Sequence, residues 1–257
     1  MNKLSVVLAV YNEEENLPKC LESVKGLADE IVIVDGGSRD KTLDIAKEFE
    51  AKIIKTTNPQ IFHVNKNKAI DAASGDWILQ LDADEVVPEQ LSLEVRKVIS
   101  SKSDINGYWI SRKNFFLGRF LTKGGQYPDL TLRLYRRGFG RLPAKDVHEQ
   151  AVVQGQVGYL KNDLLHVRDK SFSSYMERFN RYTDLLAEQL KGDRIKLNLV
   201  SGVNYILIKP LMWFLKAYLR HRGYVDLFPG FVFALFSSLR FPIAYLKYWS
   251  NHDKSSN

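Results

Sequence analysis

The chain has few of the features that secreted or membrane-spanning proteins require. It contains one cysteine, Cys20, so no disulfide can form within the chain, which fits a reducing compartment. The N-terminal stretch MNKLSVVLAVYNEEEN has a short apolar run that leads directly into acidic residues, without a small-residue cleavage site. This pattern predicts a first strand rather than a signal peptide. Internal repeats and low-complexity linkers are also lacking.

Positive charge is in excess. Lys and Arg number 37 against 30 Asp and Glu, which gives a formal net charge of +7 at pH 7. Such an excess favours a polyanionic partner, such as a nucleic acid, a phosphorylated glycan or an anionic membrane surface. The length of 257 residues suits one α/β domain with an appendage, and a hydrophobic content of 45% suffices for a core.

The first hundred residues alternate between short apolar runs and amphipathic segments. Strands are expected at Leu4–Val10, Glu30–Asp35, Ala51–Thr56 and Asp76–Asp84, and helices at Asn16–Leu27, Ser38–Phe49 and His63–Ser74, the last ended by Gly75. This alternation predicts a mostly parallel, Rossmann-like α/β sheet with helices on both faces. Ligands of such sheets bind at the carboxyl ends of the strands.

The rest of the chain changes character. Gly107–Leu121 and Asp129–Arg137 predict strands or hairpins, and a helix is expected from Ser171. Leu199–Leu219 and Val225–Trp249 are apolar and aromatic, but charged residues and prolines interrupt both before the roughly 18 apolar residues of a spanning helix. Aromatic residues beside lysines and arginines are typical of membrane interfaces, so we expect interfacial or re-entrant contact. The alternatives are an ordinary helical subdomain and a true spanning helix.

The stretch ILQLDADEVVP, at residues 78–88, places Asp82 and Asp84 at the expected end of a strand. The period of two in a strand would put both side chains on one side, where their carboxylates converge. A divalent cation would relieve the repulsion, and Mg²⁺ completes its shell with water and substrate phosphates. The motif therefore predicts a site for a metal-bound diphosphate. The alternative is a solvated acidic turn.

Two other strand ends carry acids. Glu13 follows the first expected strand, and Asp35 and Asp40 end or follow the second. Gly36 and Gly37 would let a ligand approach the backbone closely. Three acidic strand ends at one edge of a sheet favour a shared crevice over solvated turns.

Four blocks of sequence carry a resemblance to a known family. They are VVLAVYNEEENLPKCLESV, EIVIVDGGSRDKTLDIA, NKNKAIDAASGDWILQLDADE and DVHE. From Leu4 to about Glu149 the chain resembles the family 2 glycosyltransferases, inverting sugar-nucleotide enzymes of GT-A fold, and more loosely so to Trp249. It is similar in particular to bacterial enzymes that build lipopolysaccharide or lipooligosaccharide core. In these, LDADE, a VHE block and an apolar, basic C-terminal tail occur together.

The resemblance implies a site for a UDP-sugar and a divalent metal, Mg²⁺ or Mn²⁺. Ala9, Tyr11 and Glu13 would line the nucleoside pocket. Asp35 would hydrogen-bond the base, and Asp40 would support that loop. Lys66 and Asn67 would lie near the diphosphate or base, and Asp82 would contact ribose or sugar. Asp84 would bind the metal, with Asp82 and His166 as further ligands. The alternatives are simple packing for Tyr11 and an exposed helix face for Lys66.

Inverting transfer also requires a base that takes the proton of the acceptor hydroxyl. By resemblance this base is Glu149 in DVHEQ. Asp146 is the alternative, because better-known family members place an aspartate in an ED pair. His148 could orient the base, bind metal or be structural. Arg133 and Arg136 could hold a phosphate of donor or acceptor, or lie on a solvated strand face.

These expectations combine into one prediction. Residues 1–165 would form the catalytic domain, with a nucleotide-sugar half (1–100) and an acceptor half (101–165), and residues 166–257 a helical region that associates with membrane. The enzyme would move a hexose from a UDP-sugar to a membrane-anchored glycolipid. It would act at the cytoplasmic side of the bacterial inner membrane, as a peripheral or monotopic protein without a nucleic-acid partner.

Three alternatives remain open. One is a glycosyltransferase that acts on a polyprenyl-phosphate lipid carrier. Another is a nucleotidyltransferase, which would favour a Gly-rich loop and a lysine after the first strand, where this chain has acids. The third is a basic nucleic-acid-binding module, which predicts basic and aromatic residues on one face without convergent carboxylates.

Overall fold

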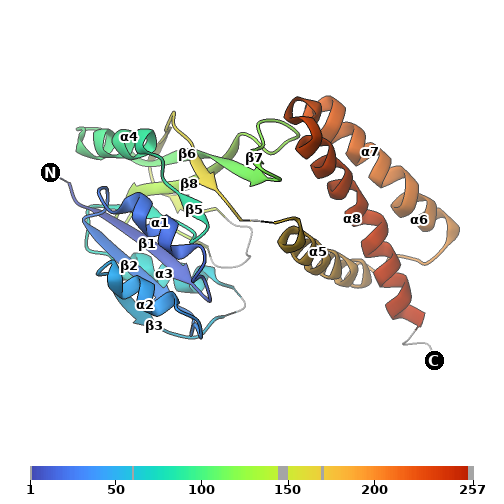
Figure 1. Cartoon of the computed structure of the whole chain (residues 1–257), viewed down its shortest axis with the longest axis horizontal. Helices are drawn as coiled ribbons and strands as arrows, with labels where there is room; N and C mark the ends of the chain where they lie inside the picture. The colour runs from blue at the N-terminus through green and yellow to red at the C-terminus, as the bar shows by residue number, and fades with distance from the viewer. Residues whose placement is uncertain (1, 60, 144–149, 169–170, 254–257) are drawn as a thin grey trace. The chain divides into compact units, whose positions relative to one another are not determined.

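The computed structural model describes residues 2–59, 61–143, 150–168 and 171–253. The chain forms two compact units (Figure 1). The first unit comprises Met1–Lys113 and Asp129–Val167, and the second comprises Asn114–Pro128 and Arg168–Asn257. The predicted assignment of catalysis and membrane association to separate regions stays a prediction.

The first unit is built on one mixed sheet. Its strands are β1 (Leu4–Val10), β2 (Glu30–Asp35), β3 (Lys52–Lys55), β4 (Trp77–Gln80), β5 (Glu85–Val86), β6 (Ile105–Phe116, whose last residues belong to the second unit), β8 (Asp129–Arg136), β11 (Gln156–Tyr159) and β12 (Leu164–His166). The order is β3-β2-β1-β4-β8-β6-β12-β5, with β11 beside β6. Strands β1 to β4 run parallel to one another, and β8 runs antiparallel to β4 and β6. Strands β9 (Gly140–Arg141) and β10 (Val152–Val153) form a separate small ladder.

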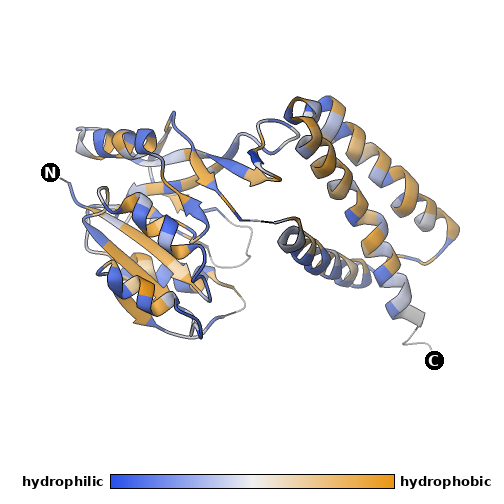
Figure 2. Ribbon diagram, in the orientation of Figure 1, coloured by the Kyte–Doolittle hydropathy of each residue, from blue (hydrophilic) through white to orange (hydrophobic). Residues whose placement is uncertain are grey.

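Helices cover both faces of this sheet, as the alternating sequence predicts. They are α1 (Leu17–Val24), α2 (Thr42–Glu48), α3 (His63–Ala72) and α4 (Glu89–Ser100). One core cluster joins apolar residues of α1, α2 and α4 to one face of β1, and another joins α3 to the opposite face. Figure 2 shows the resulting pattern, with hydrophobic strands between helices that are hydrophobic on one side only. The sheet thus forms the middle of three layers.

Several helices and strands are shorter than the sequence predicts. Helix α2 begins at Thr42, because Ser38 does not cap it; the Ser38 hydroxyl accepts a hydrogen bond from the Asn12 backbone N–H instead (2.9 Å). Helix α3 ends at Ala72, before Gly75. A side chain at Gly75 would lie 2.7 Å from the Ser5 hydroxyl, so close packing explains this glycine. Strand β4 ends at Gln80 rather than Asp84.

The second unit is helical apart from β7 (Arg119–Phe120), which forms a hairpin with the end of β6. The helices are α5 (Phe172–Gly192), α6 (Leu199–Val203), the π-helical η1 (Asn204–Ile208), α7 (Lys209–Leu215), the π-helical η2 (Lys216–Arg220), the 3₁₀ turn η3 (Gly223–Asp226) and α8 (Leu227–Asp253). Helix α8 packs against α5 and α7. Ser171 caps α5, where its hydroxyl accepts a hydrogen bond from the Ser174 N–H (3.1 Å).

Aromatic rings hold α5 and α8 together. The ring of Phe236 meets those of Tyr175 and Phe179 edge-on, at centroid distances of 5.9 and 5.7 Å. Helix α8 continues through Pro242, one of the residues that the sequence predicts as an interruption. The segment Gly223–Asn251 is long and apolar enough to cross a membrane by length and composition, and 28% of its most apolar stretch is buried.

Candidate active site

The parallel register of the first unit brings three loops to one edge of the sheet. Val10 at the end of β1 pairs with Asp35 at the end of β2, and Val7 pairs with Gln80 at the end of β4. The chain therefore leaves β1, β2 and β4 in the same direction. This confirms the predicted common edge, and it is the carboxyl edge where ligands of α/β sheets bind.

Hydrogen bonds join the first two of these loops. The backbone N–H of Glu13 donates to the Thr42 hydroxyl (2.8 Å), and that of Glu14 donates to the Asp40 carboxylate (3.1 Å). Desolvation acts to raise the pKa of Asp40, but the hydrogen bonds from Thr42 and Glu14 outweigh it, so this pKa lies below its usual value. These hydrogen bonds are contacts that Asp40 would need in order to support the loop. Its role in the site stays a prediction.

The side chain of Asp35 is directed into its own turn. It is buried, and its carboxylate accepts hydrogen bonds from the backbone N–H groups of Gly37 (3.0 Å) and Ser38 (3.1 Å). Gly37 has a φ of 91°, a conformation that favours glycine. Tyr11 is 41% exposed and Ala9 is half-buried. The roles of Ala9, Tyr11, Glu13 and Asp35 in nucleoside binding stay predictions.

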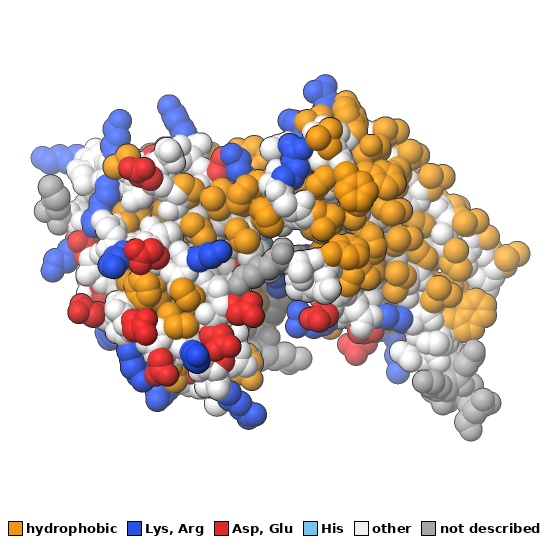
Figure 3. Space-filling model, viewed as in Figure 1, with side chains coloured by type: hydrophobic (Ala, Val, Ile, Leu, Met, Phe, Trp, Pro, Cys, Tyr) orange, Lys and Arg blue, Asp and Glu red, His pale blue; other side chains and the backbone are white. Residues whose placement is uncertain are grey.

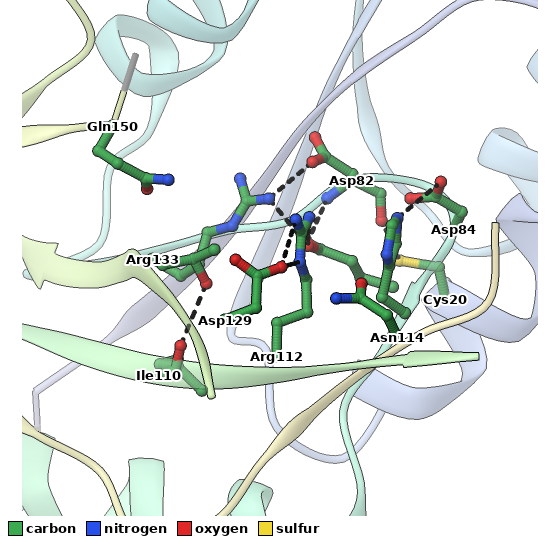
Figure 4. A network of polar contacts seen from close by, with 12 residues as sticks. Cys20, Asp82, Asp84, Ile110, Arg112, Asn114, Asp129, Arg133 and Gln150 are labelled. Carbon is green, nitrogen blue, oxygen red and sulfur yellow. Dashed lines mark hydrogen bonds and ion pairs between the residues drawn. The ribbon is translucent and has the colours of Figure 1, made fainter. Parts of the chain in front are cut away.

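Asp82 and Asp84 have separate partners (Figure 4). Asp82 forms ion pairs with Lys66 and with Arg133, whose Nη2 lies 2.6 Å from Oδ2. Asp84 Oδ2 lies 3.2 Å from His166 Nε2. The strand alternation from which we predicted that both carboxylates converge is not present, because β4 ends before them and both lie in the loop that follows.

A buried network of charges extends from Asp82. Glu85 is 0% exposed, and its Oε1 accepts hydrogen bonds from Arg133 Nη2 (2.8 Å) and Arg112 Nη1 (3.3 Å). Arg112 also pairs with Asp129 (2.8 Å), and the second oxygen of Glu85 accepts a hydrogen bond from the Asp82 N–H (2.9 Å). Each buried charge in this network therefore has a partner of opposite sign, as burial in a protein requires.

The network fixes the ionisation of its members. Desolvation opposes the negative charge of Asp82, but Arg133 and Lys66 outweigh it and hold the pKa of Asp82 well below its usual value. Burial likewise acts against the charge of Arg133, yet Asp82 and Glu85 raise its pKa above the usual value. Asp82 is thus an ionised acceptor at neutral pH.

Two predicted donor-site residues on α3 are buried. Lys66 is 4% exposed, so the alternative of an exposed helix face is wrong. The Asn67 amide donates to the Leu142 carbonyl (2.9 Å), and its oxygen accepts from the Leu142 N–H (3.1 Å). These contacts tie α3 to the chain after β9. The roles of Lys66 and Asn67 near a diphosphate or base stay predictions.

The arginines of β8 differ from each other. Arg133 is 7% exposed, so a solvated strand face is wrong for it. Its Nε has no hydrogen-bond partner among the residues that the structure describes. Arg136 lies 4.8 Å from the ring of Trp77 and donates to the Ser103 carbonyl (2.8 Å). Sequence analysis did not foresee the pairing of Arg133 with Asp82 and Glu85.

No group of three or more His, Cys, Asp or Glu side chains in the described part of the chain could hold an ion. Asp84 and His166 are two predicted metal ligands that lie together there. Strand β12 places His166 beside Glu85 of β5, and the Val167 N–H donates to the Asp84 carbonyl (2.8 Å). A carboxylate and an imidazole suit Mn²⁺, and a carboxylate suits Mg²⁺ when water and diphosphate complete the shell. The residues present therefore fit a cation that binds together with a diphosphate.

The predicted bases Asp146 and Glu149, together with His148, lie outside the described residues. Their segment joins β9 to β10 in the first unit. The identity of the base stays a prediction.

The chain is similar in sequence to known proteins. The family model described as Glycosyl transferase family 2 matches residues 5–148. The chain is 28% identical over 254 residues to the lipopolysaccharide core biosynthesis glycosyltransferase LpsC of Rhizobium meliloti, covering 92% of this chain and 91% of that protein. It is 29% identical over 244 residues to the uncharacterized glycosyltransferase RT0209 of Rickettsia typhi, covering 90% and 82%. The crystal structure of S. aureus TarS 1–349 has a TM-score of 0.48 at 17% identity, covering 91% of this chain and 81% of that one.

Proposed function

Because the chain belongs to glycosyl transferase family 2, with the GT-A fold, we propose that it transfers a hexose from a UDP-sugar to a membrane-anchored glycan acceptor, with inversion at the anomeric carbon. The acceptor would be lipopolysaccharide core or a related cell-envelope glycan, as the name of the R. meliloti relative suggests. The observation that carries the proposal is the Asp84–His166 pair, which lies beside the ionised Asp82 at the carboxyl edge of the sheet.

The donor would lie across this edge. The loops after β1 and β2 would hold the nucleoside, with Tyr11 against the base and Asp35 accepting a hydrogen bond from it. Asp82 would accept a hydrogen bond from a hydroxyl of the ribose or the sugar, because its ion pairs keep it ionised. Arg133 and Lys66 would then orient Asp82 and offset its charge beside a negative diphosphate.

Asp84 and His166 would hold the divalent cation, which when bound neutralises charge on the departing diphosphate. The backbone fixes both residues: β12 pairs with β5 at His166, and the Val167 N–H holds the Asp84 carbonyl. Such support orients metal ligands before the ion binds.

Glu149 would act as the base on the acceptor side, with Asp146 as the alternative. It would take the proton of the acceptor hydroxyl as that oxygen bonds to the anomeric carbon and the bond to the diphosphate breaks. The transfer would take place at the cytoplasmic face of the inner membrane, with the second unit in peripheral or monotopic contact. Its exposed apolar residues support this part of the proposal.

A thermal-shift experiment tests the proposal first. UDP together with Mn²⁺ or Mg²⁺ should raise the melting temperature, whereas UDP without metal should raise it much less, because ligand binding stabilises the folded state by mass action. Duplex DNA is the control for a nucleic-acid-binding module. Stabilisation by DNA but not by UDP and metal would refute the proposal. A panel of UDP-sugars, with release of UDP as the readout, would then identify the donor.

A further inference from the structure

A groove in the second unit combines apolar walls with unneutralised positive charge. Its volume is about 710 Å³, and it lies along α7 and η2 beside Phe241 of α8. Trp213, Phe241 and Leu219 line its apolar part, and Lys209, Lys216 and Arg220 supply its charge. We call this the cationic groove.

The surrounding sequence contains almost no acid that could neutralise these cations. From Arg194 through His252 there are eight Lys and Arg residues, Arg194 included, and one acid, Asp226. Asp226 is 0% exposed, and its carboxylate accepts hydrogen bonds from the N–H groups of Thr122 (2.9 Å) and Lys123 (2.8 Å). It therefore cannot serve as a counterion for the cationic groove.

Aromatic rings contact Lys209 and Lys216 of the cationic groove, and also Arg240 of α8. Lys209 Nζ lies 3.7 Å from the ring centroid of Tyr205, and Lys216 Nζ lies 5.2 Å from that of Trp213. Arg240 of α8 lies 4.3 Å from the ring of Trp213, and its buried Nε has no hydrogen-bond partner in the described part of the chain. Contact with a ring face stabilises a cation but leaves its N–H groups free to bind an anion.

The surface around the cationic groove is apolar. Leu207, Leu211, Met212 and Leu219 are 54 to 66% exposed. Figure 3 shows hydrophobic side chains covering much of the visible face of the helices of the second unit. Large exposed apolar patches mark interaction sites, and apolar helices with lysine, arginine and tryptophan lie in membrane interfaces.

We propose that the cationic groove binds an anionic membrane phospholipid. Lys216 and Arg220 would donate hydrogen bonds to phosphate oxygens of the headgroup, and Trp213, Leu219 and Phe241 would contact the upper acyl chain. A second copy of this chain fits less well, because a symmetric contact would bring two unneutralised cationic patches together. The inference rests on the proposed action at a membrane surface, and it adds a defined lipid site to that proposal.

Vesicle binding by the full-length protein tests the inference. We expect tight binding to phosphatidylcholine vesicles that contain phosphatidylglycerol, and much weaker binding to phosphatidylcholine alone. Lys216→Gln with Arg220→Gln should weaken binding to the anionic vesicles about 30-fold, since each basic residue near such a surface contributes on the order of 1 kcal/mol. Lys97→Gln with Lys102→Gln, two exposed residues of the first unit, is the control with the same change of charge.

Fluorescence quenching locates the contact. Phosphatidylglycerol with brominated acyl chains should quench the tryptophan emission of the wild type, and Trp213→Phe should remove most of that quenching. The thermal shift with UDP and metal, measured on each variant, separates this inference from glycosyl transfer. If the thermal shift persists while lipid binding is lost, the donor site is intact and the cationic groove is responsible for the lipid binding.

Three results would overturn the inference. They are equal binding of the two double variants, unchanged quenching in Trp213→Phe, and self-association through the groove without vesicle binding. Each would leave the proposed transfer standing, because the thermal shift with UDP and metal, which tests the donor site, is measured without vesicles. Conversely, lipid binding without any thermal shift by UDP and metal would refute the proposed transfer and leave the proposed lipid site standing.

Discussion

The two units treat charge in opposite ways. In the first, Glu85 is fully buried between Arg133 and Arg112, and each member of that network has a partner within the chain. In the second, no described acidic side chain forms an ion pair with Lys216 or Arg220, and apolar side chains are exposed around them. The charges of the buried network in the first unit are neutralised within the chain. The cations and exposed apolar side chains of the second unit would suit a partner outside the chain.

This difference has a consequence for substitutions. A charge removed from the buried network leaves its former partner uncompensated in a site that excludes water, which is costly. A charge removed from the cationic groove leaves nothing buried and unpaired. We therefore expect changes in the buried network to reduce activity or stability, and those in the cationic groove to change membrane binding alone.

The largest effect is expected from Asp84→Asn. The neutral amide is a poorer ligand for a hard cation, so kcat/KM should fall about 1,000-fold or more, and the metal-dependent thermal shift with UDP should shrink. The measurement is UDP release with saturating Mn²⁺. Asp104→Asn, an exposed acid of the first unit, is the matched control. If both variants are equally active, Asp84 does not bind the metal.

Arg133→Met should have the next largest effect, on stability. It leaves Asp82 and Glu85 without their shared partner, and breaking a buried ion pair typically costs about 3–5 kcal/mol. Unfolding in denaturant measures this loss. Arg137→Met, at an exposed position next to β8, and Lys216→Met, in the groove, should change the free energy of unfolding by no more than about 0.5 kcal/mol. Similar values for all three variants would contradict the contrast between the two units.

Glu149→Gln separates chemistry from donor binding. Loss of a general base should lower kcat about 100-fold or more, while the thermal shift with UDP and metal stays as in the wild type. Asp146→Asn, measured in parallel, decides between the two candidate bases. Normal turnover of Glu149→Gln together with an inactive Asp146→Asn would transfer the role to Asp146.

Much of the first unit could be predicted from the sequence, because its strands are short apolar runs between clear breaks. Strands β1 and β2 have the predicted bounds. The end of β4 could not be predicted in this way, since a strand ends where its pairing with its neighbours ends, and β1 continues to Val10 beyond that point. Gln80 pairs with Val7 of β1, and β8 pairs with β4 only as far as Leu79. An apolar run alone does not carry that information.

The buried network was missed for a different reason. Lys66 and Arg133 are far apart in sequence, and charged residues are usually exposed. One signal was available: Arg133 lies between two leucines in the largely apolar run LTLRLY, and the structure buries every residue of β8 from Thr131 to Tyr135. A charge at such a position requires an acidic partner, and LDADE offered one. In the second unit, prolines interrupt the helices less than the sequence predicts. Pro210, for example, lies in the first turn of α7, where proline is tolerated.

The smallest effect is expected at low pH, where protonation of Asp82 lowers the free energy of unfolding. Its pKa is lowered in the folded protein, so the stability gained from its ionised form is complete above the usual aspartate pKa of about 3.9 and is lost as the pH falls through its folded value. The wild type should therefore exceed Asp82→Asn in unfolding free energy by a constant amount near neutral pH, and the gap should narrow only below about pH 4. Denaturant unfolding across this range measures it, with Asp104→Asn as control. A gap that already closes near neutral pH would show that Arg133 and Lys66 do not hold Asp82 ionised, and the first unit would then lack the internal neutralisation that distinguishes it from the second.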